Sequence, residues 1–382
     1  MKIYDVLILG GGASSLMCAS HLNSSSDIAI IDNNPKLASK LKISGGGKCN
    51  ITNVEVSANN FDGEVDIVEY ALAIYSKDAL LEFLDENGLT PVIRKERYYF
   101  CKDSADEIID ILKRKSNHAH VMLNTTIGEV KKKEGIFEVN TSKGLLKAKK
   151  VVVATGGKSF KTLGATEIGL EIAKSFGLQV KEFTPALVGM TLQPTQFWMK
   201  ELSGLSCYVH ISVEGRTLKE EMLFAHKGIS GPAILSASLY WKKGNMSINF
   251  LPNDNILTLI EDSKKLISSS IPLPKRLSKA ILQALDVKDI ECKKLTQPVK
   301  ERLEKIHNYE FAPAGNFGFT KAEVSRGGVL AEELDIYTLE SKKINDLYFI
   351  GEVVDVTGEL GGYNFQWAFS SAVVCAQAID SK

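Results

Sequence analysis

The feature that most constrains this chain is a glycine-rich turn near its N-terminus, between a predicted strand and a predicted helix. Residues 4–9 (YDVLIL) form an apolar run typical of a buried strand, Gly10-Gly11-Gly12 follow directly, and Ala13 to Leu22 has helical apolar spacing. Gly10 can adopt the backbone angles of a tight turn, and Gly12 has no side chain to block a phosphate. Free N–H groups at the start of the helix attract negative charge. This arrangement predicts a dinucleotide-binding unit.

An acidic residue follows at the position where such units bind ribose. Asp27 to Asp32 is typical of a second parallel strand, and Asp32 comes 20 residues after Gly12 (32 − 12). A carboxylate there can accept hydrogen bonds from both ribose hydroxyls, which argues against a 2′-phosphate on that ribose. Ser15 replaces the third glycine of the usual GxGxxG pattern, and serine is small enough to fit against the strand.

Composition limits the architecture and the classes of partner. The chain has 382 residues and is 44% hydrophobic, enough for two or three domains. Its 46 Lys and Arg balance its 46 Asp and Glu, and no basic tract or acidic tail interrupts it, so we expect no nucleic acid or anionic lipid as main partner. No run approaches the roughly 20 apolar residues of a membrane helix. We expect a cytoplasmic protein with a small-molecule substrate and no membrane insertion.

The cysteines give no sign of a metal site or of a disulfide framework. They are scattered, with no CxxC pair and no His/Cys cluster at metal-ligand spacing. Reduced thiols are the simplest interpretation, and we expect no bound metal. The six are Cys18, Cys49, Cys101, Cys207, Cys292 and Cys375.

The segment after the first β-α-β unit favours FAD over NAD. A helical pattern in Val65 to Asn87 and a capped helix at Ser104 to Lys115 come first. A strongly apolar strand, Lys150 to Ala154, ends in Thr155-Gly156-Gly157. In the FAD-binding version of the Rossmann fold a β-meander occupies this crossover, and the strand behind it ends in Ala-Thr-Gly. Short β-like runs lie near Val121, at Ile127 to Lys131 and at Phe137 to Thr141.

The middle of the chain changes character near Pro185. Alternating runs such as Tyr208 to Val213 and Met246 to Leu251 predict a β-rich insert that reaches about Asn253. No second glycine fingerprint follows a strand in this insert, so a dedicated NAD(P)H domain is not expected. The rest of the insert is helical by pattern, at Ile256 to Ile267, Pro274 to Leu285 and Thr296 to Ile306.

The C-terminus returns to the nucleotide fold. Leu347 to Ile350 is typical of a strand, Gly351-Glu352 follow, and Gly361-Gly362-Tyr363-Asn364 opens a helix that runs to about Ile379. A glycine and an acid after a strand can hydrogen-bond a ribityl chain, and a helix N-terminus can stabilise negative charge on the pyrimidine end of a reduced flavin. These features suit FAD and make little sense for NAD.

Five segments resemble, in order and over nearly the whole chain, the bacterial BaiN-like, aminoacetone-oxidase-like FAD-dependent oxidoreductases. They are SGGGKCNITN (44–53), ATGGKSF (154–160), LFAHKGISGPA (223–233), LPKRL (273–277) and YFIGEVVDVTGELGGYNFQWA (348–368). The resemblance implies an α/β fold with a Rossmann-like FAD-binding domain of the glutathione-reductase type, built from residues 1–185 and 320–382. It also implies an inserted β-barrel at 186–253 and 309–319, with a small helical subdomain at 254–308.

The resemblance further implies which residues bind the cofactor. By this resemblance Gly12, Ala13 and Ser14 meet the pyrophosphate, Asp32 the adenosine ribose, and Val130 the adenine through its backbone. Lys40 and Ser44 to Asn50 follow the pyrophosphate and ribityl chain towards the isoalloxazine, and Thr155 and Gly156 line the adenosine side. The C-terminal segment holds the flavin half. The set is Gly10, Gly12, Ala13, Ser14, Asp32, Lys40, Ser44, Gly45, Gly46, Gly47, Lys48, Cys49, Asn50, Val130, Thr155, Gly156, Gly157, Gly351, Glu352, Asp355, Gly362, Tyr363 and Asn364.

The chain departs from the family pattern at a few positions. Ala38-Ser39 stand where the family usually has Gly-Arg, Lys48 replaces an arginine, and residues 165–168 (ATEI) replace a Ser-Thr-Gly-Asp-like stretch. These changes remove guanidinium groups and a backbone-permissive glycine. We still expect FAD binding, because one lost charge-assisted hydrogen bond is worth only about 1.5–3 kcal/mol.

Three residues are candidates for catalysis, each with a structural alternative. Cys49 could be a nucleophile, but it has no neighbouring cysteine to form a redox pair, so a packed thiol is the alternative. His226 could move a proton near the flavin or could be structural. Tyr363 could close over the flavin ring or only pack at the start of its helix.

The sequence leaves three functional hypotheses for this FAD-binding oxidoreductase. The first is a flavin-dependent reductase or dehydrogenase that takes electrons from NAD(P)H and acts on a small or apolar unsaturated substrate. The second is a flavin oxidase of a small amine, with electrons passing to oxygen, as the aminoacetone-oxidase resemblance implies. The third is a non-catalytic protein that binds FAD for stability or sensing.

Overall fold

The computed structural model describes residues 2–261 and 263–382, which divide into two compact units. The first unit comprises Met1–Pro185 and Glu323–Lys382, and the second, here called the insert unit, comprises Ala186–Ala322. Within the described residues, no helix is both long and apolar enough to cross a membrane.

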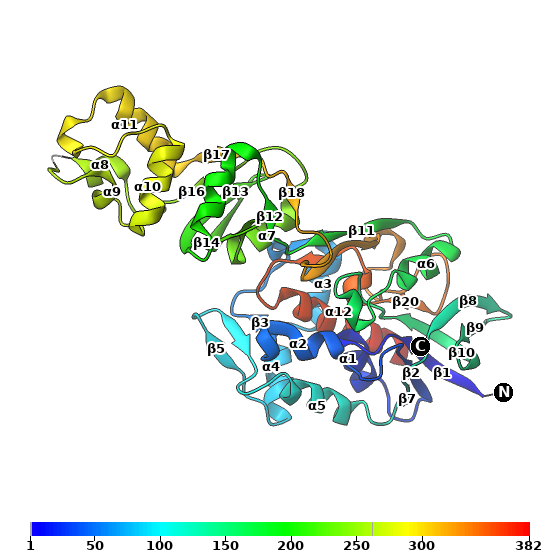
Figure 1. Ribbon diagram of the computed structural model, residues 1–382. Coiled ribbons are helices and arrows are strands. Elements are labelled where there is room, and N and C mark those ends of the chain that lie inside the picture. Colours follow the sequence, from blue (N-terminus) through cyan, green and yellow to red (C-terminus); the bar gives the residue numbers. More distant parts are fainter. Residues whose placement is uncertain (1, 262) are drawn as a thin grey trace. The chain divides into compact units, whose positions relative to one another are not determined.

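Five parallel strands form the centre of the first unit, in the order β7-β2-β1-β10-β20 (Figure 1). Strands β2 and β7 follow β1 on one side of it, and β10 and β20 lie on its other side. The order of strands therefore reverses between β1 and β10, where open α/β sheets bind their ligands. The strands are β1 (Ile3–Leu9), β2 (Ile28–Ile31), β7 (His120–Met122), β10 (Gly144–Val153) and β20 (Leu347–Phe349).

A β-meander links β7 to β10, as the sequence predicted. Strands β8 (Ile127–Lys133) and β9 (Ile136–Thr141) pair antiparallel with each other, and β9 pairs antiparallel with the first half of β10. The second half of β10 pairs parallel with β20. The Rossmann-type FAD-binding fold with this crossover is confirmed.

Helices of the first unit pack around the N-terminal helix. Helix α1 (Ala13–His21) contacts both α12 (Tyr363–Asp380) and α5 (Asp106–Lys115), and the core is formed by fully buried side chains such as Leu16, Trp367 and Phe369. The predicted helix at 65–87 is two helices, α3 (Val65–Ile74) and α4 (Lys77–Glu86), because Ser76 between them is extended and caps α4. Its hydroxyl accepts a hydrogen bond from the N–H of Ala79 at 3.2 Å.

A small antiparallel sheet in the first unit was not predicted. Strand β3 (Asn50–Asn53) pairs with β6 (Tyr98–Phe100), which pairs with β5 (Val92–Arg94). These strands are only three or four residues long and mostly half-exposed, so they carry no clear apolar alternation. The other short elements of this unit are α2 (Ser39–Gly47), α6 (Ile168–Ser175), β4 (Phe61–Asp62) paired with β21 (Thr357–Gly358), and β11 (Val180–Ala186) paired with β19 (Val324–Val329).

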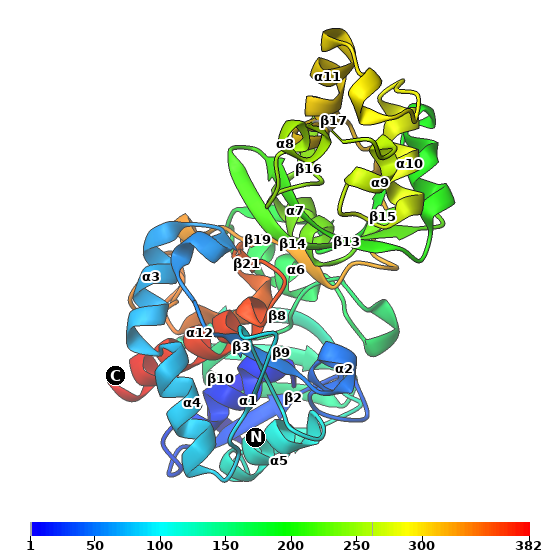
Figure 2. The same ribbon diagram turned by 90° about the vertical axis from the view of Figure 1, so that its left-hand side faces the viewer.

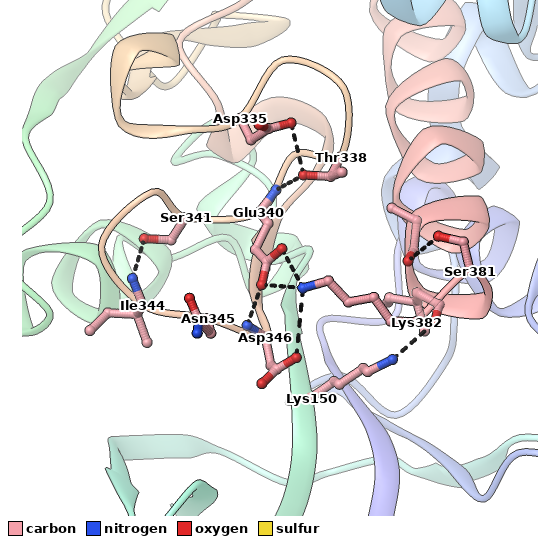
Figure 3. Close-up of polar contacts among 12 residues, drawn as sticks. Lys150, Asp335, Thr338, Glu340, Ser341, Ile344, Asn345, Asp346, Ser381 and Lys382 are labelled. Carbon is pink, nitrogen blue, oxygen red and sulfur yellow. Dashed lines mark hydrogen bonds and ion pairs between the residues drawn. The ribbon is translucent and has the colours of Figure 1, made fainter.

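Ion pairs hold the C-terminal end of α12 beside the central sheet (Figure 3). The Lys382 ammonium lies 2.6 and 2.7 Å from the two carboxylate oxygens of Glu340, and 3.9 Å from an oxygen of Asp346, the residue before β20. Lys150 of β10 donates to the carbonyl of Ile379 at 2.9 Å. These contacts fix the C-terminal end of α12, while its N-terminal part packs on β3.

Seven antiparallel strands form the sheet of the insert unit, in the order β17-β16-β13-β14-β15-β12-β18. Only residues 312–314 connect the first strand of this order to the last, so at most about 14 Å separates Phe311 from Gly315. The sheet therefore curls like a barrel, although no pairing among the described residues joins its two edge strands. The strands are β12 (Met190–Thr191), β13 (Ser206–Val213), β14 (Arg216–Ala225), β15 (Gly228–Ser230), β16 (Met246–Asn249), β17 (Tyr309–Phe311) and β18 (Gly315–Asn316).

Helix α7 (Pro232–Tyr240) packs on β13, β14 and β15, and the sequence did not predict it. Seven of its nine residues are buried, so it lacks the polar face that gives a helix its recognisable period.

The helical part of the insert unit contains α8 (Ile256–Ile260), α9 (Ile267–Ser270), α10 (Lys275–Ala284) and α11 (Gln297–Glu304) (Figure 2). The predicted helix from Ile256 to Ile267 is wrong in extent. Asn255 caps its start, but the backbone becomes extended at Glu261 and the chain re-enters a helix only at Ile267. Residue 262 of that prediction lies outside the described residues.

Candidate functional site

The glycine turn leaves an open space in front of α1. Gly10 has φ +109°, and a Cβ there would lie 2.3 Å from the carbonyl oxygen of Ala154, so only glycine lets β1 and β10 approach this closely. A Cβ on Gly12 would meet no atom of the chain within 4 Å. Gly12 is the N-cap of α1 and offers no side-chain cap, so the first N–H groups of the helix face this space. An anion fits there.

Asp32 is fixed against the glycine turn at the end of β2. One carboxylate oxygen accepts from the N–H of Gly11 at 2.5 Å, and the other accepts from the N–H of Asn34 at 2.7 Å. Ser15 is fully buried, so the structure accommodates serine at the position of the third glycine. These contacts place a half-exposed carboxylate at the same edge of the sheet as the open space.

The loop at residues 38–50 combines a short helix with left-handed glycines. Ala38 precedes α2 with φ +57° and ψ +30°, and its N–H donates to the carbonyl of Gly11 at 2.8 Å. Gly45 and Gly46 are both left-handed, and a Cβ on Gly46 would meet nothing within 4 Å. The loop thus lies next to the glycine turn and presents two exposed glycines, Gly45 and Gly46.

An ion pair joins this loop to the C-terminal segment. The Lys40 ammonium lies 2.7 Å from Oε2 of Glu352, and Oε1 of the same carboxylate accepts from the N–H of Ser325 at 2.8 Å. A Cβ on Gly157 would lie 2.7 Å from Oε1 of Glu352. Three predicted cofactor-binding positions, at 40, 157 and 352, therefore lie together.

The loops after β10 and β20 also meet the start of α1. Gly351 has φ +71°, and a Cβ there would lie 2.8 Å from the hydroxyl of Ser14. The indole N–H of Trp367 donates to the carbonyl of Gly351 at 3.0 Å. Thr155 has a buried hydroxyl without a hydrogen-bond partner among the described residues. A buried polar atom of this kind is expected to bind a ligand or water.

The N-terminus of α12 packs on β3. Gly362 is left-handed, and a Cβ there would lie 2.7 to 2.8 Å from backbone atoms of Thr52. The Asn364 side chain bonds both the N–H and the carbonyl of Gly358 at 2.9 Å, so it orders the loop that leads into the helix. The start of α12 therefore lies beside the strand that follows the 44–49 segment.

Two other predicted positions have clear structural partners. Asp355 pairs with Lys181 at 3.1 Å, and burial raises the pKa of this carboxyl. Val130 is buried in β8, opposite Val139 of β9. Because β8 is the last strand of its sheet, half of its backbone groups face away from β9 and could contact an adenine ring.

Cys49 does have a neighbouring cysteine in space, so the expectation that it has none is wrong. The N–H of Cys101 donates to the carbonyl of Cys49 at 3.4 Å, next to the β3–β6 pair Asn50–Phe100, and the two thiols share a hydrogen bond. This bond and burial raise the pKa of Cys49, while the bond lowers the pKa of Cys101. Cys49 is fully buried, which favours the packed thiol over the nucleophile.

The other two catalytic candidates differ in environment. Tyr363 is 2% exposed, packs edge-on against Phe61, and its hydroxyl contacts Arg97. Burial raises the pKa of Tyr363, and Arg97 partly offsets this. His226 lies in the turn between β14 and β15 of the insert unit and is exposed. Within the described residues no group of His, Cys, Asp and Glu could hold a metal ion.

The residues of the first unit fit FAD. Loops that follow β1, β2, β10 and β20 meet at the carboxyl edge of the parallel strands, where the open space before Gly12 and the unpartnered Thr155 hydroxyl both suit a dinucleotide. Sequence reasoning missed Ser325 and Cys101. Ser325 binds Glu352, and its hydroxyl accepts from the N–H of Lys158 at 2.8 Å. Neither residue belongs to a local motif that could have identified it.

Comparison with known proteins identifies similar chains over the full length. The model of the HI0933-like protein Rossmann domain matches residues 4–378. A ribosomal RNA dihydrouridine synthase of Haemophilus influenzae is 36% identical, over 98% of both chains, and one of Escherichia coli is 35% identical, over 99% of this chain and 98% of that protein. A 3-dehydro-bile acid delta(4,6)-reductase of Clostridium scindens is 25% identical, over 97% and 98%.

Solved structures with the same fold are more distant in sequence. An Escherichia coli quinol fumarate reductase subunit has a TM-score of 0.55 and 14% identity, covering 100% of this chain and 70% of that one. A 3-ketosteroid delta1-dehydrogenase of Sterolibacterium denitrificans has a TM-score of 0.52 and 11% identity, covering 100% of both chains. These likenesses concern the fold alone. From its family match and the resemblance stated above, the chain belongs to the HI0933-like Rossmann family and is an FAD-dependent oxidoreductase.

Proposed function

We propose that this protein is a flavin-dependent reductase of a conjugated carbon–carbon double bond, and that its substrate is uridine within ribosomal RNA. The observation that carries the proposal is full-length similarity, at 36% and 35% identity, to two ribosomal RNA dihydrouridine synthases. Similarity over 98% or more of the chain covers both units, including the insert that would recognise the substrate.

The names of the more distant relatives are consistent with one reaction class. Dihydrouridine differs from uridine by saturation of the C5–C6 double bond, which is conjugated with a carbonyl. The bile acid delta(4,6)-reductase is likewise named for reduction of double bonds. In both cases the reaction adds a hydride to one carbon and a proton to its neighbour. We propose an RNA substrate in place of the small or apolar molecule that the sequence suggested.

The residues of the first unit have clear tasks in such a reaction. FAD, when bound, supplies the hydride-transfer chemistry. The glycine turn at 10–12 and the start of α1 would bind the pyrophosphate, and Asp32 would fix the adenosine ribose. The Lys40–Glu352 pair would hold the loops around the ribityl chain. The N-terminus of α12 at Gly362 would stabilise negative charge near the reactive end.

The proton must come from a different group. His226 is the candidate because its side chain is exposed, whereas those of Cys49 and Tyr363 are buried. Cys49 and Tyr363 are buried, with pKa values raised by their surroundings, so neither is well suited to donate repeatedly. We assign them to packing next to the cofactor loops.

We propose NAD(P)H as the electron donor. The chain carries no second glycine fingerprint, so the donor would bind transiently and leave before the substrate arrives. In the alternative, an amine oxidase, an amine would reduce the flavin and oxygen would reoxidise it rapidly.

A single set of measurements tests these assignments. The purified protein, with its yellow FAD spectrum verified, is mixed anaerobically with NADH, NADPH or a panel of amines, and flavin bleaching is followed by stopped flow. It is then incubated with NADPH and unmodified rRNA transcripts, and digested nucleosides are analysed by mass spectrometry for dihydrouridine. Bleaching by a nicotinamide and formation of dihydrouridine are expected. Bleaching only by amines would overturn the reductase in favour of the oxidase.

A further inference from the structure

The two units carry opposite net charge, although the whole chain is neutral. The insert unit contains 18 Lys and Arg and 13 Asp and Glu, a net charge of +5. The first unit has the remaining 28 and 33, a net charge of −5. Whole-chain neutrality argued against a polyanionic partner, but the balance of the insert unit alone does not.

The positive charge of the insert unit is concentrated in its helical part. Residues 263–294 contain eight Lys and Arg and only three Asp and Glu, so this stretch alone has a net charge of +5. All eight basic side chains are exposed. These 32 residues, which include α9 and α10 (Figure 2), therefore carry a net positive charge as large as that of the whole insert unit.

Backbone pairing gathers five of these lysines on one local structure. The N–H of Cys292 donates to the carbonyl of Lys265 at 3.0 Å, the N–H of Lys293 donates to the carbonyl of Ser263 at 3.1 Å, and Leu266 forms an antiparallel bridge with Glu291. Two segments, 263–267 and 290–293, therefore run side by side. Five exposed lysines lie on these segments or within two residues of them in the sequence. We call this set the lysine ridge: Lys264, Lys265, Lys288, Lys293 and Lys294.

Two carboxylates, Asp289 and Glu291, lie among the five lysines of the ridge, and two more, Glu261 and Asp262, precede it in the sequence. Glu291 lies 3.3 Å from Lys293 and 3.5 Å from Lys294, and these ammonium groups lower its pKa. Asp289 is turned to the backbone N–H and hydroxyl of Ser268, at 3.0 and 2.6 Å. Like charges that face each other across paired segments destabilise them, so fold stability gives no reason to collect lysines here.

We propose that the lysine ridge is the surface on which the insert unit binds the phosphate backbone of the RNA substrate. The proposal rests on the proposed function for the choice of RNA. Exposed ammonium groups bind phosphates as point charges without reading sequence, which suits a surface that positions an RNA while a separate site reacts with one base. Release of counterions on binding makes such contacts strongly dependent on salt.

The test compares two quadruple variants of the full-length, FAD-loaded protein. The ridge variant replaces Lys264, Lys265, Lys293 and Lys294 with Gln. The control variant replaces four exposed lysines of the first unit, Lys102, Lys113, Lys131 and Lys149, with Gln and so has the same net charge. Binding of labelled rRNA transcript is measured by filter binding at several salt concentrations. FAD absorbance, NADPH-dependent flavin bleaching and dihydrouridine formation are measured on the same preparations.

The ridge variant is expected to bind RNA at least about tenfold more weakly at 0.1 M salt, with a salt slope reduced by about 3 because each lost phosphate contact removes about 0.7–0.9. Its FAD content and flavin bleaching should not change. The control variant should bind nearly as the unaltered protein does. Equal binding by the ridge variant and the unaltered protein would overturn the ridge while leaving the proposed function intact. If the ridge binds RNA but no dihydrouridine forms, the RNA-binding surface is supported and the proposed reaction is refuted. If the unaltered protein does not bind RNA, the proposal that the ridge binds RNA is refuted.

Discussion

The Lys40 ammonium and the Glu352 carboxylate lie 2.7 Å apart, although 312 residues separate them in the sequence. The pair joins the loop after β2 to the loop after β20, and the other oxygen of Glu352 holds the N–H of Ser325. The two side chains are partly shielded from solvent, with 33% and 18% of their surface exposed. The pair is therefore a contact between the two segments that form the first unit, and we propose that it shapes the space for the ribityl chain.

Replacing Lys40 with Met should weaken FAD retention about 10- to 100-fold, which corresponds to the loss of one charge-assisted hydrogen bond of about 1.5–3 kcal/mol. Lys42→Met is the matched control, since Lys42 lies on the same short helix but pairs with the exposed Asp106. The dissociation constant for FAD is measured by fluorescence quenching after the cofactor has been removed. Equal affinities of the Lys40 variant and the unaltered protein would refute a role for Lys40 at the cofactor.

Gly12→Val should abolish FAD retention without disturbing the fold. A Cβ at this position meets no atom of the chain within 4 Å and the backbone there is not left-handed, so only a ligand in front of α1 would clash with the valine. Gly315→Val, in strand β18 of the insert unit, is the control. Absorbance of bound flavin and circular dichroism are compared for both variants. A normal flavin content in the Gly12 variant would show that the pyrophosphate does not bind in this space.

Ala38→Gly should stabilise the protein by up to about 1.5 kcal/mol. Ala38 is left-handed, which costs an L-residue about 1–2 kcal/mol, and glycine removes this strain while losing about 0.5–1 kcal/mol of chain entropy. The same change at Ala280, inside helix α10, should cost about 1 kcal/mol. Urea unfolding of the FAD-free proteins measures both. If Ala38→Gly lowers the free energy of unfolding as much as Ala280→Gly does, the backbone at Ala38 is not strained.

Local pattern was enough to predict the parts of the fold that depend on local geometry. The strand before Gly10, the acid at Asp32 and the meander before Ala154 each follow from a period or a spacing, and the structure has them. Contacts between distant segments were not predictable from one sequence. The Cys49–Cys101 pair depends on a short, half-exposed sheet, and the charge excess of residues 263–294 was hidden by the neutrality of the whole chain.

Cys207 should reduce the stability of the protein at alkaline pH. Burial raises the pKa of this thiol to about 12, from its ordinary value of 9.0. The folded state therefore keeps its proton where the unfolded state loses it, so the contribution to stability is complete below pH 9 and falls as the pH rises from 9 towards 12. The slope is about 1.4 kcal/mol per pH unit. In Cys207→Ala the free energy of unfolding, measured with urea, should fall less steeply between pH 9 and 11, by nearly this slope. If the free energies of the two proteins fall in parallel over this range, the titrating group is not Cys207.

His226→Gln should lower kcat for dihydrouridine formation by about 10²-fold or more, the usual contribution of a positioned proton donor. FAD content and the rate of flavin bleaching by NADPH should be unaffected, because His226 belongs to the insert unit and the glycine turn to the first. His210→Gln, in strand β13 of the same unit, should leave kcat unchanged. An unchanged kcat in the His226 variant would show that the proton comes from another group.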